Sequence, residues 1–536
     1  MKTGCAFLAA APLAAALSCP AAAAWRVAET EHFIYYSEAP EAELVQTVTR
    51  METFDKLVRV LTGNTRPSSP VKVTMFEVAS MDDVNATFPY ESRGVGGYFS
   101  TTAQGPFLVT FRNTLREGRN SAFRAAKQSI AWGPEVRQHE YLHSYMYQYF
   151  NANYPTWYSE GFAEYYGSMS FPEPGIVEIG HAPHFRMDTI LRQPWLPVAK
   201  LLTAKSYADI DNVGMLYAEG WLLTHYAAQN PARGKQLQQY LKSVATGAPY
   251  DKAAKDAFGN PEALDKELKN HARDLQAVRL SLKPVDVGKI AVRELSPVEN
   301  AMMRYRIRLN SGFAYSTLPL AVRAVKAARA ADPANLQALH VQAQLENLAG
   351  MEVDALKTAD AILARDPNNV WGLTEKGKAM VGVLTPQSNA TAWAAARAPL
   401  EHAARLDKLA IEPRVALYRS YEGQGALADL LAQNRLVEAF NLLPQDDDIR
   451  YLLARDFEQR GMLDDAIKVI EPAAFGSFDG DEGKKKKRER ARVQAAERYT
   501  NISTYESPGD MLARLTAKKE GRWDETRQTI KPAATT

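Results

Sequence analysis

Two histidines and a glutamate stand at a spacing that suits metal chemistry, in the segment His139-Glu140-Tyr141-Leu142-His143. On a helix, positions i and i+4 project from the same face, so the two imidazoles can bind one zinc ion. Glu140 then lies beside the metal, where its carboxylate can act as general base toward a water molecule. The spacing therefore predicts a zinc-dependent hydrolase.

A third metal ligand is expected shortly after His143. Zinc in a hydrolytic site usually takes three protein ligands and leaves one position for water. Glu160 follows after a short loop, and Glu164 lies one helical turn further on the same face. We therefore expect Glu160 to be the third ligand. We expect Glu164 to accept a hydrogen bond from the free ring N–H of a zinc-binding histidine.

Two residues indicate where the second helix lies. Pro155 can begin it, because a proline in the first turn loses no intrahelical hydrogen bond. Gly161 is expected where the second helix lies close to the first, because a side chain at this position would crowd the first helix.

The two segments together, HExxH and then Pro-x-Trp-x-x-Glu-Gly-x-Ala-Glu-Tyr, resemble the gluzincin zinc peptidases and, within them, bacterial peptidase MA-like domains. The resemblance covers roughly residues 25–275. It implies the same three zinc ligands and the same general base, and a peptide bond as the bond that is hydrolysed. Ser159 stands where the family usually has an asparagine, which removes a substrate-side amide but no ligand.

A hydrogen-bond donor for the oxyanion is expected from a helix over residues 213–229. Zinc-catalysed acyl hydrolysis needs such a donor besides the metal. Gluzincins often supply a tyrosine or histidine from a helix well beyond the third ligand. Tyr217 fits this order, and His225 is the alternative donor. A half-buried aromatic face explains the same pattern equally well. His181 and His184 are interpreted as loop histidines, because the zinc already has three ligands.

The segments before the zinc motif predict a small mixed sheet. Helices are expected over residues 40–62 and 134–150, and further helices over 232–275 complete a helical lobe. Strands are expected over residues 32–36, 71–76, 94–100, 106–111 and 176–179. In gluzincins an edge strand above the zinc helix binds the substrate backbone by β-augmentation. Residues 105–111 are the candidate for this strand, and an ordinary hairpin packed on the helix is the alternative.

The second half of the chain predicts a helical repeat. Asp332-Pro333 and Asp366-Pro367 recur at a spacing of 34 residues, which is the tetratricopeptide period. We expect a solenoid over residues 317–477, with an insertion at 384–390, after a linker at 276–316. Its concave side is a usual docking surface for a peptide or protein. An irregular helical bundle without a partner is the alternative.

The first residues are interpreted as a secretory signal peptide, 1–24. Met1-Lys2 precedes a short apolar run and small residues, and the run is too short to span a bilayer. Cys19 raises the possibility of a lipoprotein, but the residues before it match the usual lipoprotein signal motif, which begins with leucine, only poorly. Both cysteines lie in this segment, so the mature chain has no thiol chemistry. A periplasmic or secreted protein is expected.

Charge gives no sign of a nucleic-acid partner, since the formal net charge is +2. The basic run at 484–492 is interpreted as a solvated part of a charged, partly disordered tail, 478–536. No transmembrane segment is expected.

The sequence thus predicts an α+β protein of two parts: a gluzincin-like zinc hydrolase domain at 25–275, with a small mixed sheet and a helical lobe, and an all-α tetratricopeptide-like solenoid. The expected function is that of an exported Zn²⁺ metallopeptidase acting on a peptide or protein. Two alternatives stay open. One is a non-catalytic scaffold whose repeats dock a protein partner, and the other is a zinc hydrolase of a non-peptide bond. A chain ending near Arg273 is expected to fold alone.

Overall fold

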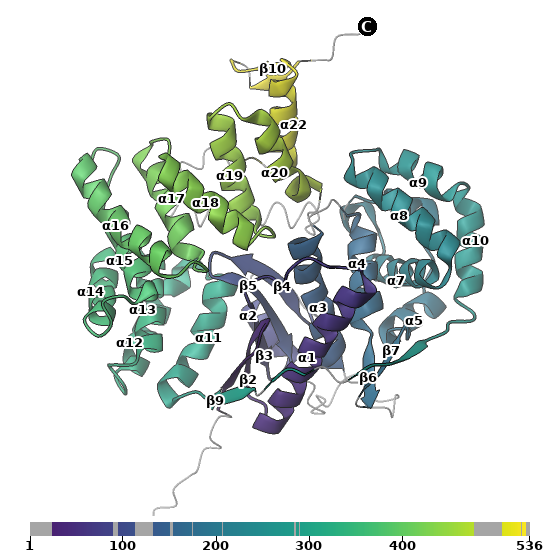
Figure 1. The fold of residues 1–536 in the computed structure, drawn as a ribbon, viewed down its shortest axis with the longest axis horizontal. Coiled ribbons are helices and arrows are strands. Elements are labelled where there is room, and N and C mark those ends of the chain that lie inside the picture. Colours follow the sequence, from purple (N-terminus) through teal and green to yellow (C-terminus); the bar gives the residue numbers. More distant parts are fainter. Residues whose placement is uncertain are drawn as a thin grey trace, which may run out of the picture.

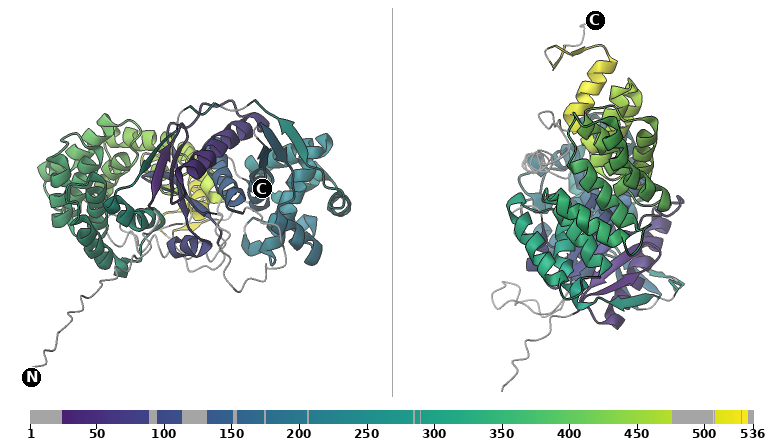
Figure 2. Two further views of the ribbon diagram at one scale, coloured as in Figure 1. Left: turned by 90° about the horizontal axis from the view of Figure 1, so that it is seen from below. Right: turned by 90° about the vertical axis from the view of Figure 1, so that its left-hand side faces the viewer.

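The computed structural model describes residues 24–531 except 89–94, 113–131, 151–153, 476–505 and the single positions 174, 206, 284, 285, 289, 507 and 527. A sheet lies in the middle of the molecule, between a stack of paired helices and a separate helical lobe (Figures 1 and 2). The expected signal peptide, except Ala24, and the basic run at 484–492 lie outside the described residues. Within the described part of the chain, no helix combines the length and apolar character needed to cross a membrane.

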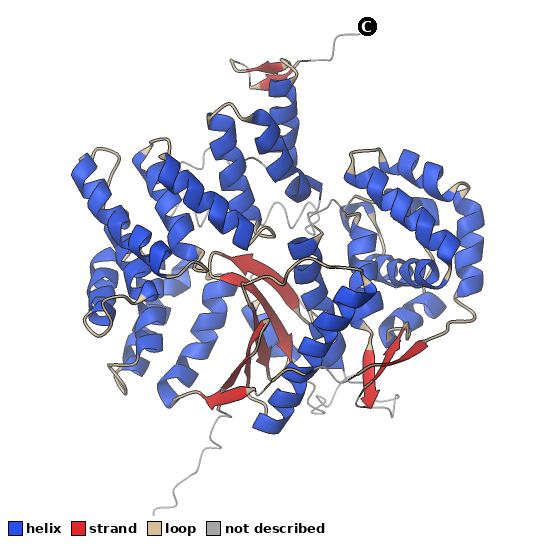
Figure 3. Cartoon of the chain, in the orientation of Figure 1, coloured by secondary structure: helices blue, strands red, loops and turns tan. Residues whose placement is uncertain are grey.

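The central sheet is mixed and has the strand order β4-β5-β3-β2-β1-β9. Strand β3 pairs in parallel with β2 and β5, and the other pairs are antiparallel. A second sheet has the order β6-β7-β8 and lies beneath the helical lobe (Figure 3). The strands are β1 (Arg26–Glu29), β2 (Phe33–Ser37), β3 (Val73–Val78), β4 (Tyr98–Thr102), β5 (Gly105–Phe111), β6 (Ser170–Glu173), β7 (Ile176–Ile179), β8 (Val278–Ser281), β9 (Ala291–Glu294), and a small hairpin, β10 (Trp523–Asp524) and β11 (Thr529–Ile530).

The two faces of the central sheet are covered by different helices. Side chains alternate along each strand, so Tyr35 and Met75 lie on one face and their neighbours Tyr36 and Phe76 on the other. The first face packs against α1 (Glu41–Leu61) and α3 (Trp132–Tyr149). The second face packs against α2 (Met81–Thr87) and α11 (Pro297–Ser311). Helix α3, which carries the HExxH segment, is therefore fixed to the sheet.

The helical lobe follows α3 and matches the expected helices closely. Helix α7 begins and ends at the predicted residues, 213 and 229. The lobe consists of α4 (Thr156–Gly167), α5 (His184–Arg192), α6 (Val198–Thr203), the 3-10 helix η2 (Tyr207–Asp209), α7 (Val213–Gln229), α8 (Pro231–Ala245), α9 (Tyr250–Phe258) and α10 (Pro261–His271).

The C-terminal part is an all-α stack of helix pairs with the predicted period. Helices α13 and α15 begin 34 residues apart, at Leu336 and Val370. Their caps, Asn335 and Asn369, share φ −63° and ψ 114°, and each side chain accepts from the backbone N–H three residues ahead. The helices are α12 (Leu318–Arg329), α13 (Leu336–Leu348), α14 (Glu352–Leu363), α15 (Val370–Gly382), α16 (Ala390–Leu406), α17 (Glu412–Gln424), α18 (Leu430–Leu442), α19 (Asp447–Gln459), α20 (Leu463–Phe475) and α22 (Pro508–Lys519). The 3-10 helix η3 (Tyr315–Thr317) precedes α12.

Residues 276–316 differ from the expected linker, because they complete both sheets. Strand β8 pairs with β7, β9 pairs with β1, and α11 buries Met303 and Ile307 against the second face of the central sheet. The expected tail, 478–536, likewise contains an ordered helix. Met511 and Leu515 of α22 are buried in the core of the repeats.

Helix α11 and the stack that follows it contact the hairpin formed by β4 and β5 at one place each. At its start, the Tyr98 and Ser311 hydroxyls lie 2.6 Å apart. Near its end, Asp446 in the α18–α19 turn interacts with the Thr101 side chain, and Ala103 packs against the apolar core of the repeats. The two parts of the chain are therefore joined through the sheet. The sequence instead predicts a zinc domain that folds independently of the repeats.

Candidate metal centre

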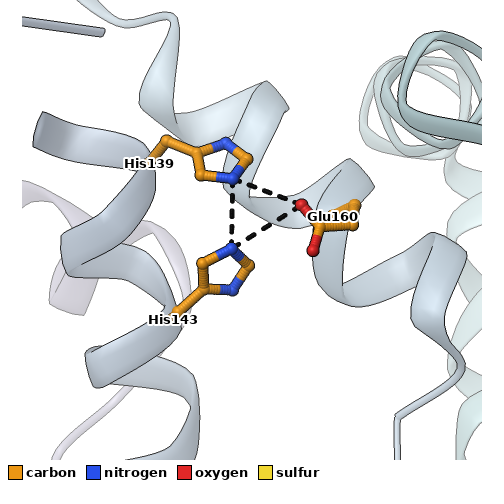
Figure 4. A group of neighbouring side chains, drawn as sticks. All are labelled: His139, His143 and Glu160. Atoms are coloured by element: carbon orange, nitrogen blue, oxygen red, sulfur yellow. Dashed lines mark hydrogen bonds and ion pairs between the residues drawn. The ribbon is translucent and has the colours of Figure 1, made fainter. Parts of the chain in front are cut away.

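The structure brings His139, His143 and Glu160 together between α3 and α4 (Figure 4). The two histidine Nε2 atoms lie 3.1 Å apart. Glu160 Oε2 is 3.2 Å from His139 Nε2 and 3.6 Å from His143 Nε2. In a tetrahedral zinc site with bonds of about 2.0–2.1 Å, neighbouring ligand atoms are separated by about 3.3–3.4 Å. Two of the three measured distances are slightly shorter than this value and the third is slightly longer, so the three atoms are spaced as zinc ligands would be.

The chemistry of these three groups also fits a zinc ion. Two imidazole nitrogens and one carboxylate oxygen are a common ligand set of catalytic zinc. Glu160 is only 2% exposed, and its Oε2 faces the two histidine nitrogens. A buried carboxylate oxygen in this position is costly unless a positive charge lies against it. A zinc ion bound to the three atoms would supply that charge.

The charges within the cluster perturb its titrating groups strongly. Burial alone would raise the pKa of Glu160, but His143 and His139 hold it well below its ordinary value. Burial alone would lower the pKa of His139, but the Glu160 hydrogen bond and the charges of Glu164 and Glu140 raise it to about 9. The negative charges that raise the pKa of His139 would also favour a metal cation at these nitrogens.

Glu140 lies between the candidate metal ligands and strand β4. Burial raises the pKa of its carboxyl group, although His139 and His143 partly oppose the increase. The Phe99 backbone N–H of β4 hydrogen-bonds this carboxyl group. A Cβ at Gly97 would lie 2.6 Å from Val136 Cγ1 and 3.1 Å from Glu140 Cγ, so the glycine allows the strand to approach α3.

The edge strand beside the cluster is β4, which corrects the expectation for residues 105–111. Those residues form β5, which lies between β4 and β3 and has a partner on each side. The sequence indicated both strands of the hairpin but contained no signal for which of them faces outward.

Glu164 lies beside the ring nitrogen of His139 that does not face Glu160. Its Oε1 is 3.5 Å from His139 Nδ1, and it also accepts a hydrogen bond from Arg186 on α5. The Arg186 guanidinium in turn lies over the Tyr217 ring, 4.5 Å from its centre. Glu164 is thus held where a carboxylate that orients His139 should be.

Of the two expected oxyanion donors, the structure places Tyr217 at the cluster and His225 away from it. The Tyr217 ring stacks on the His139 ring, with centroids 6.2 Å apart and an interplanar angle of 24°. His225 is fully buried elsewhere, with its Nδ1 2.7 Å from His271 Nε2. His181 is exposed and pairs with Glu178. His184 begins helix α5 and so does not lie in a loop as expected, and its side chain lies outside the described structure.

Tyr207 is a residue at this site that the sequence did not reveal. It belongs to the short 3-10 helix η2 and donates a hydrogen bond of 2.5 Å to Glu160 Oε1. Its hydroxyl also lies 3.2 Å from that of Tyr217. Tyr207 and Arg186 belong to no motif and to no strongly periodic segment, so only the folded chain brings them to the ligands.

Gly161 makes a close contact, but with α7 rather than with α3 as expected. A Cβ at Gly161 would lie 2.3 Å from the Gly220 carbonyl oxygen. It is Gly167 that faces α3, where a Cβ would lie 3.2 Å from the backbone nitrogen of His139. Helix α4 thus contacts α3 through Gly167 and α7 through Gly161, and it positions Glu160 between the histidines and Tyr217.

The sequence matches no protein-family model and no curated protein. Among solved structures, a thermophilic tetratricopeptide repeat protein from Thermus thermophilus is similar with 19% identity and a TM-score of 0.29, over 38% of this chain and 96% of that one. MamA is similar with 20% identity and a TM-score of 0.25, over 32% and 92%. A tetratricopeptide repeat protein from Parabacteroides merdae is similar with 14% identity and a TM-score of 0.25, over 54% and 99%. These TM-scores are too low to assign a fold, and none of these names mentions a peptidase.

Proposed function

We propose that the chain is an exported zinc-dependent metallopeptidase. The observation that supports this most strongly is the cluster of His139, His143 and Glu160, with a carboxylate, Glu140, directly beside it. A purely structural zinc site needs ligands but no base. The neighbouring edge strand and the tyrosine hydroxyls are further features that a hydrolase of extended chains would use.

The residues of the site have separable roles in this proposal. When bound, zinc would acidify a water molecule and polarise the substrate carbonyl. Glu140 accepts the proton of the attacking water and later delivers it to the leaving amine, and its raised pKa suits both steps. Tyr217 donates a hydrogen bond to the oxyanion. Burial, followed by the charge of Glu160, raises the pKa of Tyr217 well above the ordinary value, so the proton stays on the Tyr217 hydroxyl oxygen.

The proposed substrate is an extended segment of a peptide or protein. Strand β4 is the edge of the central sheet and passes directly beside Glu140. An extended chain that adds to this edge would place a backbone carbonyl near the metal ligands. A zinc hydrolase of a non-peptide bond would have no use for this edge, which favours a peptide bond.

A second candidate is a protein-binding scaffold without catalysis. The stack of helix pairs favours it, because such stacks commonly dock other proteins. The 34-residue distance between the starts of α13 and α15 is the period of tetratricopeptide repeats, which are stacks of this kind. In this account the zinc domain would support the repeats, and Glu140 would have no role.

Metal analysis and an unbiased peptide-library digest of the mature protein distinguish the two candidates. We expect about one zinc per chain, since three ligands are supplied. We also expect cleavage that a chelator abolishes and added zinc restores. Replacing His143 with alanine should remove both the zinc and the cleavage. A zinc-loaded protein that cleaves no peptide and captures a folded protein instead would support the scaffold.

A further inference from the structure

Each oxygen of the Glu160 carboxylate has a different neighbour. Oε2 faces the two histidine nitrogens at 3.2 and 3.6 Å. Oε1 accepts the hydrogen bond of 2.5 Å from Tyr207. Because a carboxylate can bind a metal through one oxygen or through both, this division decides the coordination number of a bound ion.

We propose that Tyr207 is a positioning residue that restricts Glu160 to binding zinc through Oε2 alone. This inference rests on the proposed function only in requiring that the cluster binds zinc. A hydrogen bond to one carboxylate oxygen holds it away from the metal and leaves the other oxygen as the single donor. Three protein donors then leave the fourth tetrahedral position for water, which a zinc hydrolase requires.

The direction of the hydrogen bonds around Tyr207 is set by their partners. A carboxylate can only accept, so the single Tyr207 proton points to Glu160. The Tyr207 oxygen is then the acceptor for Tyr217, whose hydroxyl is 3.2 Å away. The rings of the two tyrosines are stacked at 18°, with centroids 6.3 Å apart, which keeps the hydroxyls adjacent. Tyr207 therefore also holds the Tyr217 hydroxyl close to the cluster, and the Tyr217 proton would turn from Tyr207 to the oxyanion when a substrate is bound.

The alternative is that Tyr207 merely fills space against Tyr217. A phenylalanine at position 207 keeps the ring and removes only the hydroxyl, so it separates the two explanations. Tyr226→Phe is a matched control, because Tyr226 also donates to a glutamate, Glu267, at 3.0 Å, but outside the cluster. The control variant should leave the metal site unchanged.

The test uses the full-length protein loaded with cobalt(II) in place of zinc. Four-coordinate cobalt(II) absorbs visible light more strongly than five-coordinate cobalt(II), so the absorption reports the number of ligands. We expect Tyr207→Phe to lower this absorption, because Oε1 joins the metal. Tyr226→Phe should give the wild-type spectrum. A wild-type spectrum in Tyr207→Phe would overturn the proposal.

A measurement on the wild type keeps the proposal testable if the variant does not fold. Zinc K-edge X-ray absorption of the unmodified protein should show Glu160 bound through one oxygen. A carboxylate bound through both oxygens would overturn the inference. Because both measurements report coordination and not hydrolysis, they stand apart from the peptidase proposal. A wild-type protein that binds no metal would refute both.

Discussion

Gly161 on α4 and Gly220 on α7 meet backbone to backbone, and this contact sets the distance between Glu160 and Tyr217. A Cβ at Gly161 would lie 2.3 Å from the Gly220 carbonyl oxygen and 2.8 Å from Thr224 Oγ1. Restoring an ordinary contact distance requires the two helices to separate by about 1 Å. We expect Gly161→Ala to lower the free energy of unfolding by about 1–3 kcal/mol, as overpacking of an interior does.

The same separation should impair catalysis more than metal binding. It moves Tyr217 away from Glu160, and a misplacement of about 1 Å can reduce the rate about 100-fold. The contact of α4 with α3 is made elsewhere, through Gly167 and the backbone of His139, so the three ligands should stay together. We therefore expect kcat to fall about 100-fold while zinc remains bound.

Gly214→Ala is the control for this prediction. Gly214 lies on the same helix, α7, but a Cβ there would meet its nearest neighbour at an ordinary 3.5 Å. Replacing a helical glycine of this kind should be neutral or stabilise by up to about 1 kcal/mol. For both variants, urea unfolding gives the free energy of unfolding, chelator competition gives the zinc affinity, and peptide hydrolysis gives kcat. Wild-type stability and wild-type kcat in Gly161→Ala would refute the argument that this contact positions Tyr217.

Three further changes test other parts of the structure. Glu164→Ala should weaken zinc binding about 10–100-fold by releasing His139, and Glu160→Ala should weaken it more; the reverse order in a chelator titration would exchange their roles. Tyr217→Phe should keep its zinc and lose about 100–1000-fold in kcat, as the loss of an oxyanion donor does; an unchanged kcat would leave Tyr217 as a packing residue. A chain ending at Arg273 should unfold at lower urea than the full chain, because it lacks β9 and α11, which cover the sheet; equal stability and full zinc loading would mean that the first part folds alone.

The sequence predicted those parts of the site that depend on short-range spacing. His139 and His143 are one helical turn apart, and Glu160 follows after a short loop, so their meeting needs little more than two adjacent helices. Tyr217 could be named because the family resemblance implies a donor on a helix well beyond the third ligand, and residues 213–229 form such a helix, α7. The 34-residue period of the repeats was likewise visible, because two Asp-Pro pairs mark equivalent turns before Asn335 and Asn369.

The remaining features depend on contacts between distant residues, which local patterns do not report. Arg26 and Glu294 pair across β1 and β9 although they are 268 residues apart, and β9 is too short to show periodicity. Strand order in the β4–β5 hairpin depends on which strand reaches β3. Tyr207 reaches Glu160 from an irregular segment, so its role appears only once the lobe has folded.

The central claim, that Glu140 is the base of a zinc-dependent peptidase, is tested most directly with Glu140→Gln. The amide has nearly the same shape but cannot accept a proton from water as a carboxylate does. Zinc content and cleavage of a peptide library should be measured in parallel on this variant and on the wild type. We expect about one zinc per chain in both proteins and cleavage by the wild type alone. Wild-type cleavage by Glu140→Gln, or no cleavage by a zinc-loaded wild type, would contradict the claim.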